Sequence, residues 1–368
     1  MNKTEYCNIP KSIEDKLSRK LHNQKNHPIE IIKRHVYDYF LNLKTYKFDV
    51  FDDLDPIVSI EDNFDKLLIS KDHPARSKSD TYYVNENQVL RTHTSAHQNK
   101  LLSDKYTSFL ITGDVYRKDE VDAKHYPVFH QMEMLTIVDD NKDAEQELNK
   151  LLSGLVEYLF PNCEYRFNPD YFPFTEPSFE IEVKYNGSWL EILGCGIVQQ
   201  QILNNNNIFN KKAIAVGFGL DRLAMIFGNI TDIRYLWSTH ERFLSQFADG
   251  KINKFQPYSE LPSQTRDISF YVPKIKLDID SNNDQNKWFD ENDFCELARE
   301  FAGDVLEEVK LLGSFYNKKI DKYSRTYRMF YSPNDPSVKN PAEFFDIVNT
   351  IQDSLRNKVS SSLNVELR

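Results

Sequence analysis

The stretch Pro127–Val138 carries side chains suited to binding a small ligand. Its run of β-branched and aromatic residues predicts a strand. Alternate residues of a strand share one face, so Phe129, Gln131 and Glu133 lie together. A carboxylate and an amide fit poorly into an apolar core. Beside an aromatic ring they form a suitable floor for a ligand that has a flat ring and an ammonium group.

The preceding predicted strand, Ser108–Lys118, ends in a cationic side chain. Gly113 leaves room for another group to lie against the backbone, and Arg117 ends the row of side chains on its face. The polar loop Asp119–Tyr126 brings His125 close to that end. A lone arginine on a hairpin is ordinarily solvated. Because Arg117 and His125 occur beside the ring, amide and carboxylate of the next strand, we interpret the hairpin as a ligand site.

A glycine-rich junction between a strand and a helix is a second candidate. The strand Ala213–Gly219 leads into a helix from about Leu220 to Phe227. Gly217 and Gly219 permit close approach to the backbone, a helix N-terminus favours anions, and Arg222 adds a full positive charge. The spacing matches neither a Walker loop nor a dinucleotide fingerprint. Taken alone, such a junction is often purely steric.

The run Phe172–Pro177 is a third candidate. Phe172 and Phe174 flank a proline, so both rings lie in a stiff segment that could line a pocket for an aromatic ligand. Packing in the core is the alternative.

Hydrophobic periodicity predicts the elements that position these groups. Apolar residues recur at helical spacing after Pro28 and again within Asp143–Leu159. A β-rich stretch is expected from Lys47 to about Val89. Another hairpin is expected at Glu180–Tyr185 and Trp189–Ile192, around an Asn-Gly turn. These elements predict an α+β domain over 28–248, an antiparallel sheet with flanking helices, preceded by an extension at 1–27.

A linker and a second domain are predicted beyond residue 248. The segment 249–262 has the glycine and prolines of a linker. Residues 263–368 then give the order βαββαβ, which is the split-βαβ, ferredoxin-like motif. Its expected elements are strands 266–272, 305–315, 323–331 and 363–367, helices 291–301 and 341–360, and an Asn/Asp-rich loop at 278–287. Any small α+β domain would give a similar order.

Composition and residue patterns argue against several classes of protein. No apolar run approaches the roughly 20 residues of a membrane helix. Four scattered cysteines without a CxxC pair argue against structural zinc and disulfides. The net charge of −10 is unusual for a protein that binds nucleic acid. The first 27 residues lack the Arg-rich, acid-poor pattern of a transit peptide.

Five ordered motifs resemble the class II aminoacyl-tRNA synthetases, specifically the single-chain organellar phenylalanyl enzymes. The resemblance extends from about His22 to Arg368. The motifs are His93-Thr94-Ser95-Ala96-His97-Gln98; Gly113-Asp114-Val115-Tyr116-Arg117 followed by His125 and Phe129-His130-Gln131-Met132-Glu133; Phe172–Pro177; Glu191-Ile192-Leu193-Gly194-Cys195-Gly196; and Gly217–Arg222.

The resemblance implies an ATP site and a magnesium ion. Arg117 is expected to bridge the amino-acid carboxylate and the α-phosphate, and Arg222 to stack on adenine, with Phe129 on its other face. Further ATP contacts are expected from Lys124, His125, Tyr126 and Glu191. Glu191 is also the candidate Mg²⁺ ligand, with Glu176 as the alternative.

The resemblance also implies a pocket for phenylalanine. Gln131 and Glu133 are expected to bind the ammonium group with help from Ser95, and Ala215 to set the depth at the para position of the ring. The full expected set is His93, Thr94, Ser95, Ala96, His97, Gln98, Gln131, Met132, Glu133, Phe172, Phe174, Ala215 and Val216. Val216 and Asp221 depart from the family, which often has an aromatic residue and glutamate there. A thinner wall at Val216 would relax specificity towards bulkier amino acids.

For the second domain the resemblance implies anticodon binding to tRNA(Phe). Expected contacts are Lys318, Lys319, Lys322, Arg325 and Arg328, interleaved with aromatic residues. The domain as a whole is mildly acidic, so a solvated strand is the alternative. The resemblance further implies a monomer located in the mitochondrial matrix, although no transit peptide is visible.

Two other interpretations stay open on the residues alone. A non-catalytic RNA-binding paralogue would be expected to lose Arg117, Arg222 or Glu133, yet all three are present. A class II ligase that does not use tRNA would not need the second domain.

Overall fold

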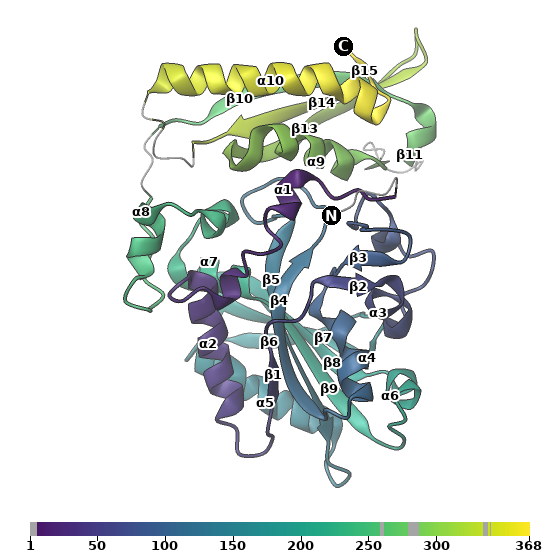
Figure 1. Ribbon diagram of the computed structural model, residues 1–368, viewed down its shortest axis with the longest axis vertical. Helices are drawn as coiled ribbons and strands as arrows, with labels where there is room; N and C mark the ends of the chain where they lie inside the picture. Colours follow the sequence, from purple (N-terminus) through teal and green to yellow (C-terminus); the bar gives the residue numbers. More distant parts are fainter. Residues whose placement is uncertain (1–5, 258–260, 279–286, 334–337, 339) are drawn as a thin grey trace.

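The computed structural model describes residues 6–257, 261–278, 287–333, 338 and 340–368. A seven-stranded sheet in the order β1-β4-β5-β9-β8-β7-β6 forms the centre of the larger part (Figure 1). The β1–β4 pair is parallel, and the other neighbouring strands pair antiparallel. The strands are β1 (Asp49–Phe51), β4 (Ser108–Tyr116), β5 (Val128–Val138), β6 (Tyr165–Asp170), β7 (Thr175–Tyr185), β8 (Ser188–Val198) and β9 (Lys212–Gly219).

Helices cover both faces of this sheet (Figure 1). One hydrophobic cluster joins it to α2 (Pro28–Leu41), α5 (Ala144–Leu159) and α7 (Leu220–Gly228). A second cluster, on the other face, includes residues of α4 (Gln98–Ser103) and α6 (Gln200–Asn205), with α3 (Ile60–Asn63) packed against it. The α+β class predicted from the sequence is therefore confirmed.

Local sequence signals explain where the long helices begin. In α2, Ile29, Ile32, Val36 and Phe40 are buried at helical spacing. The preceding His27 side chain accepts a hydrogen bond from the Ile29 amide, which caps the first turn. In α5 the Asp143 carboxylate accepts the Gln146 amide at 2.9 Å in the same way.

The C-terminal part forms a four-stranded antiparallel sheet in the order β13-β14-β10-β15. Its elements are β10 (Gln264–Val272), α9 (Glu291–Ala302), β13 (Leu306–Asn317), β14 (Lys322–Tyr331), α10 (Pro341–Leu363) and β15 (Glu366–Leu367), with β11 (Leu277–Asp278) paired to β12 (Lys287–Trp288) as an insertion. Leaving out the inserted pair, this is the expected βαββαβ order. The part has its own hydrophobic core.

Helix α9 faces the larger part of the molecule (Figure 1). Its Asp293 accepts a hydrogen bond from Lys118 at 2.7 Å, and its Arg299 donates to the Asp119 carbonyl. The Tyr82 hydroxyl donates to Glu296 at 2.5 Å. The loop that follows β4 is therefore bound to the C-terminal part.

The N-terminal residues pack on the larger part. Ile13 of α1 (Lys11–Glu14) is buried in the same cluster as α2, together with Ile9 and Leu21. Helix α8 (Glu241–Leu244) follows α7 along the chain. Within the described residues, no helix is long and apolar enough to cross a membrane.

The structure corrects the expected β-rich stretch from Lys47 to Val89. Besides β1, this region holds only the short strands β2 (Ile57–Ser59) and β3 (Gln88–Leu90) among its described elements, with helical turns between them. Capping side chains explain the error, since Ser59 accepts the Asp62 amide and His73 accepts the Ala75 amide. The hairpin expected at 180–192 is longer, forming β7 and β8, and β6 was not predicted. Residues 258–260 of the expected linker and 279–286 of the expected loop lie outside the described residues.

Candidate active site

The buried carboxylate of Glu133 is the polar centre of one end of the site. It accepts hydrogen bonds from Ser95, from Gln98 and, at 3.4 Å, from Thr94. The donors belong to the turn Thr94–His97, which packs against β5, and to the start of α4. The structure therefore brings together the expected ammonium-binding group and three of its expected neighbours.

Burial raises the pKa of Glu133 to about 7, despite the hydrogen bonds from Ser95, Gln98 and Thr94, which favour the charged form. Burial makes ionisation of Glu133 costly in free energy. A nearby ammonium ion would therefore stabilise the charged carboxylate strongly. This electrostatic setting suits recognition of an amine.

Aromatic rings form a wall near this carboxylate. Phe172 and Phe174 stack with ring centroids 6.0 Å apart, and Phe174 lies 6.1 Å from the ring of His93. Gly194 makes room for them, because a Cβ there would lie 2.8 Å from Cζ of Phe172. Burial lowers the pKa of His93 to about 3, so its ring is neutral. Both ring nitrogens of His93 lack a hydrogen-bond partner among the described residues.

Glycines leave open space over the middle of the sheet. Gly217 on β9 pairs with Glu133 on β5 and with Gly194 on β8. A Cβ at Gly217 would meet no heavy atom within 4 Å, whereas an interior position is close-packed. This open strip connects the Glu133 pocket with the start of α7.

Two arginines border the open strip. The guanidinium of Arg117 lies 5.2 Å from the centroid of the Phe129 ring, and its Nε donates to the Thr92 carbonyl at 2.7 Å. Arg222, in the first turn of α7, donates to the Glu191 carbonyl at 3.1 Å and to its carboxylate at 3.2 Å. The arginines expected at the ATP site thus lie directly after β4 and in the first turn of α7.

The expected magnesium ligands differ in their surroundings. Glu191 is half exposed and lies against Arg222. Glu176 is exposed at the start of β7. No group of three or more histidine, cysteine, aspartate or glutamate side chains that could hold a metal occurs among the described residues. Glu191 fits Mg²⁺ as a single carboxylate that would need oxygens from a ligand to complete the shell.

Three of the expected pocket residues do not face the site. Met132 and Val216 are buried in the cluster under α2 and α7, on the opposite face of the sheet from Glu133 and Ala215. Strand alternation explains this, because neighbours on a strand point to opposite faces. Ala96 is packed into the core on the site's own side. The expectation that Val216 thins the pocket wall is wrong.

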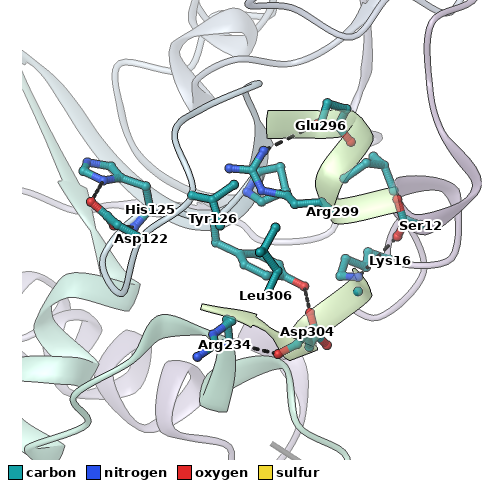
Figure 2. Close-up of a pocket in the computed structure, with 14 residues that line it drawn as sticks. Ser12, Lys16, Asp122, His125, Tyr126, Arg234, Glu296, Arg299, Asp304 and Leu306 are labelled. Atoms are coloured by element: carbon teal, nitrogen blue, oxygen red, sulfur yellow. Dashed lines mark hydrogen bonds and ion pairs between the residues drawn. The ribbon is translucent and has the colours of Figure 1, made fainter. Parts of the chain in front are cut away.

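Two more expected residues are engaged elsewhere. The Tyr126 hydroxyl donates a hydrogen bond of 2.6 Å to Asp304 of the C-terminal part, a contact drawn in Figure 2. Nε2 of His97 lies 2.9 Å from the Arg91 guanidinium. His125 lies on the loop beside Asp122, at 2.8 Å, and Lys124 is exposed.

The basic residues expected to contact tRNA do not form one surface. Arg325 is 1% exposed and paired with Glu291 inside the domain, so the expectation that it contacts tRNA is wrong. Arg328 is paired with Asp267 and Lys322 with Glu366. Lys318 and Lys319 are exposed at the hairpin between β13 and β14.

Two buried pairs were not predicted as part of the site. Arg91 forms an ion pair with Asp114 at 2.9 Å, and Asp221 accepts a hydrogen bond from the His130 amide at 2.6 Å. Gly113 carried a signal for the first pair, because a Cβ there would lie 2.0 Å from Nη2 of Arg91. The room expected over Gly113 is filled by this side chain.

Comparison of the sequence with known proteins gives the family of the chain. Residues 12–247 match the family model for the tRNA synthetases class II core domain (F). The chain is 45% identical to the chloroplastic/mitochondrial phenylalanine–tRNA ligase of Arabidopsis thaliana, over 98% of this chain and 82% of that one. It is 39% identical to the mitochondrial phenylalanine–tRNA ligase of Dictyostelium discoideum, over 98% and 89%. A pyrrolysyl-tRNA synthetase structure from Desulfitobacterium hafniense aligns with a TM-score of 0.47 at 16% identity, over 64% and 80%.

The sheet, its covering helices and the matched core domain define a class II tRNA synthetase. Within that class, the chain belongs to the phenylalanine–tRNA ligase family, since the two phenylalanine–tRNA ligases named above are 45% and 39% identical to it over 98% of its length.

Proposed function

We propose that this chain activates phenylalanine with ATP, forming an adenylate and releasing diphosphate, and then transfers the phenylalanyl group to the terminal adenosine of tRNA(Phe) with release of AMP. Membership of the phenylalanine–tRNA ligase family supports the overall reaction. The single observation that carries the site assignment is the open strip at Gly217, which has the Glu133 pocket at one end and Arg222 at the other.

Recognition of phenylalanine is assigned to the Glu133 end of the strip. Glu133, Gln131 and Ser95 bind the ammonium group, while Phe172, Phe174 and Ala215 contact the ring. The stacked rings and the buried Ala215 support an apolar slot. A tyrosine hydroxyl in such a slot would lose its hydrogen bonds to water, which costs several kcal/mol.

Activation needs no general base, because the attacking carboxylate is already ionised at neutral pH. One carboxylate oxygen forms a bond to the α-phosphorus, and the bond from that phosphorus to the leaving diphosphate breaks. Arg117 stabilises the crowded negative charge, since its planar guanidinium can bind two oxygens at once. Its Nε is anchored on the Thr92 carbonyl, so little reorganisation is required.

The adenine of ATP is assigned to the space between Phe129 and Arg222, and His125 to the phosphates. Mg²⁺ held by Glu191 would neutralise phosphate charge. Glu191 forms an ion pair with Arg222 at 3.2 Å, so the carboxylate and the guanidinium hold each other beside the strip.

The domain assignment follows the sequence. We propose an extension at 1–27, the catalytic domain at 28–248, a linker at 249–262 and an anticodon-binding domain at 263–368. Exposed Lys318 and Lys319 support an RNA contact at the β13–β14 hairpin. The relatives named above are organellar enzymes, which supports an organellar location. We assign the chain to the mitochondrial matrix, as a monomer.

Charging of tRNA(Phe) with labelled phenylalanine tests the function. Wild type should charge the tRNA, and Glu133→Ala should lose charging while keeping its fold. Matched control Glu157→Ala alters an exposed carboxylate on α5, which packs on the opposite face of the sheet, and should keep full activity. Charging by Glu133→Ala at the wild-type rate would contradict the site assignment.

A further inference from the structure

A pair of buried side chains joins α7 to β5 directly behind the residues assigned to ATP. Asp221 is 2% exposed and His130 is 0% exposed. The Asp221 carboxylate accepts a hydrogen bond from the His130 amide at 2.6 Å, and the His130 ring Nδ1 lies 3.2 Å and 3.3 Å from its two oxygens. The two residues are 91 positions apart in the chain.

Sheet register explains why a carboxylate is needed here. Strands β5 and β9 pair as far as Gln131 and Gly219, after which β9 ends and α7 begins. The amide of His130 thus lies just past the last backbone pair on this side. A buried amide requires an acceptor, and Asp221 supplies one from the first turn of the helix, where a negative charge is favoured.

Each member of the pair is next to a residue that is assigned to ATP. Asp221 directly precedes Arg222 on α7, and His130 lies between Phe129 and Gln131 on β5. Arg222 and Phe129 are assigned to opposite faces of the adenine. The contact between Asp221 and His130 therefore fixes the spacing of the two groups that enclose the base.

Aromatic packing holds the His130 ring from behind. Trp237 stacks on it with centroids 5.5 Å apart and planes inclined by 25°. Tyr126 also stacks on Trp237, with centroids 5.5 Å apart and planes inclined by 21°. The ring centroid of His22 lies 5.6 Å from that of His130. With these rings packed around it, His130 has little freedom to follow a shift of α7.

We propose that Asp221 and His130 are a positioning pair for ATP, a role that rests on the proposed function of Phe129 and Arg222. Neither side chain touches the substrate. The pair sets the width of the adenine slot. A gap of about 0.5–1 Å forfeits a quarter to a half of the dispersion attraction at a stacked face, so a small displacement of α7 would weaken ATP binding.

Steady-state kinetics of Asp221→Asn test the proposal. In phenylalanine-dependent exchange of labelled diphosphate into ATP, the variant should raise KM for ATP about tenfold, because charge-assisted hydrogen bonds become neutral ones. KM for phenylalanine should stay within about twofold, since the Glu133 pocket is held by other contacts. Asp221→Glu keeps the carboxylate and should recover much of the ATP affinity.

Tyr37→Phe is the matched control. The Tyr37 hydroxyl shares a buried hydrogen bond of 2.8 Å with Thr112, which likewise joins a helix to the sheet on the same face. This variant should lower Tm and leave KM for ATP unchanged. If Asp221→Asn does the same, or if its two KM values rise together, the positioning role is overturned.

Two further outcomes are distinguishable. If Asp221→Asn does not fold, His130→Gln tests the same pair, because it keeps the backbone contact and removes the ring contact. An ATP KM equal to that of wild type in His130→Gln would overturn the proposal. Absence of exchange in wild type with every amino acid would instead refute the proposed function.

Discussion

Replacing Glu133 with glutamine should weaken phenylalanine binding and make the stability of the folded protein less dependent on pH. The carboxylate lies buried against Ser95 and Gln98, and burial raises its pKa to about 7 from the ordinary 4.5. The neutral form is therefore favoured in the folded protein. Its contribution to stability is complete below about pH 4.5 and is lost as the pH rises through about 7.

The size of the effect follows from the shift. A raised pKa of about 7 implies that ionisation costs roughly 3 kcal/mol of folding stability at high pH. Between about pH 5 and pH 8 the wild type should lose roughly 2 kcal/mol relative to Glu133→Gln, which has no proton to lose there. Lost hydrogen bonds give the variant a constant penalty of about 1 kcal/mol at every pH.

Urea unfolding of both proteins at the two pH values measures this difference. KM for phenylalanine should rise about tenfold to a hundredfold in Glu133→Gln, as expected when an ammonium ion loses a charged partner. Ser95→Ala should raise the pH at which the folded protein loses stability, since the Ser95 hydrogen bond favours the ionised form of Glu133. A stability difference that is the same at both pH values would refute the reasoning.

Three further perturbations are informative. Gly194→Ala places a Cβ 2.8 Å from the Phe172 ring, so KM for phenylalanine should rise several-fold while KM for ATP is unchanged in the exchange assay. The double change of Lys318 and Lys319 to alanine should raise KM for tRNA without altering diphosphate exchange, and a parallel loss of exchange would contradict a role confined to RNA. Chelation by EDTA should abolish exchange, and added Mg²⁺ should restore it. Full activity in EDTA would contradict the proposed role of Mg²⁺.

Strong local patterns made much of the fold predictable. Helices α2 and α5 follow from apolar spacing with capping residues at their starts. The β4–β5 hairpin follows from two strand-forming runs. The prediction of a β-rich stretch at 47–89 was wrong because the elements there are short. They are determined by side-chain caps and tertiary contacts, which hydrophobic periodicity does not reveal.

Strand alternation predicted which side chains of β5 share a face. Glu133 and Gln131 were placed on one face correctly, whereas Met132 and Val216 were added from motif position and lie on the other. The expected tRNA contact of Arg325 was wrong for the same reason, because this side chain shares the helix-facing side of β14 with the buried Tyr327. The pairs Arg91–Asp114 and Asp221–His130 join residues distant in sequence, so only the fold reveals them.

Exchange of labelled diphosphate into ATP, measured with each of the twenty amino acids for wild type and Arg117→Ala, tests the central claim most directly. The account predicts exchange with phenylalanine alone in wild type, and loss of that exchange in the variant. Exchange at the wild-type rate in Arg117→Ala, or no exchange in wild type with any amino acid, would contradict it.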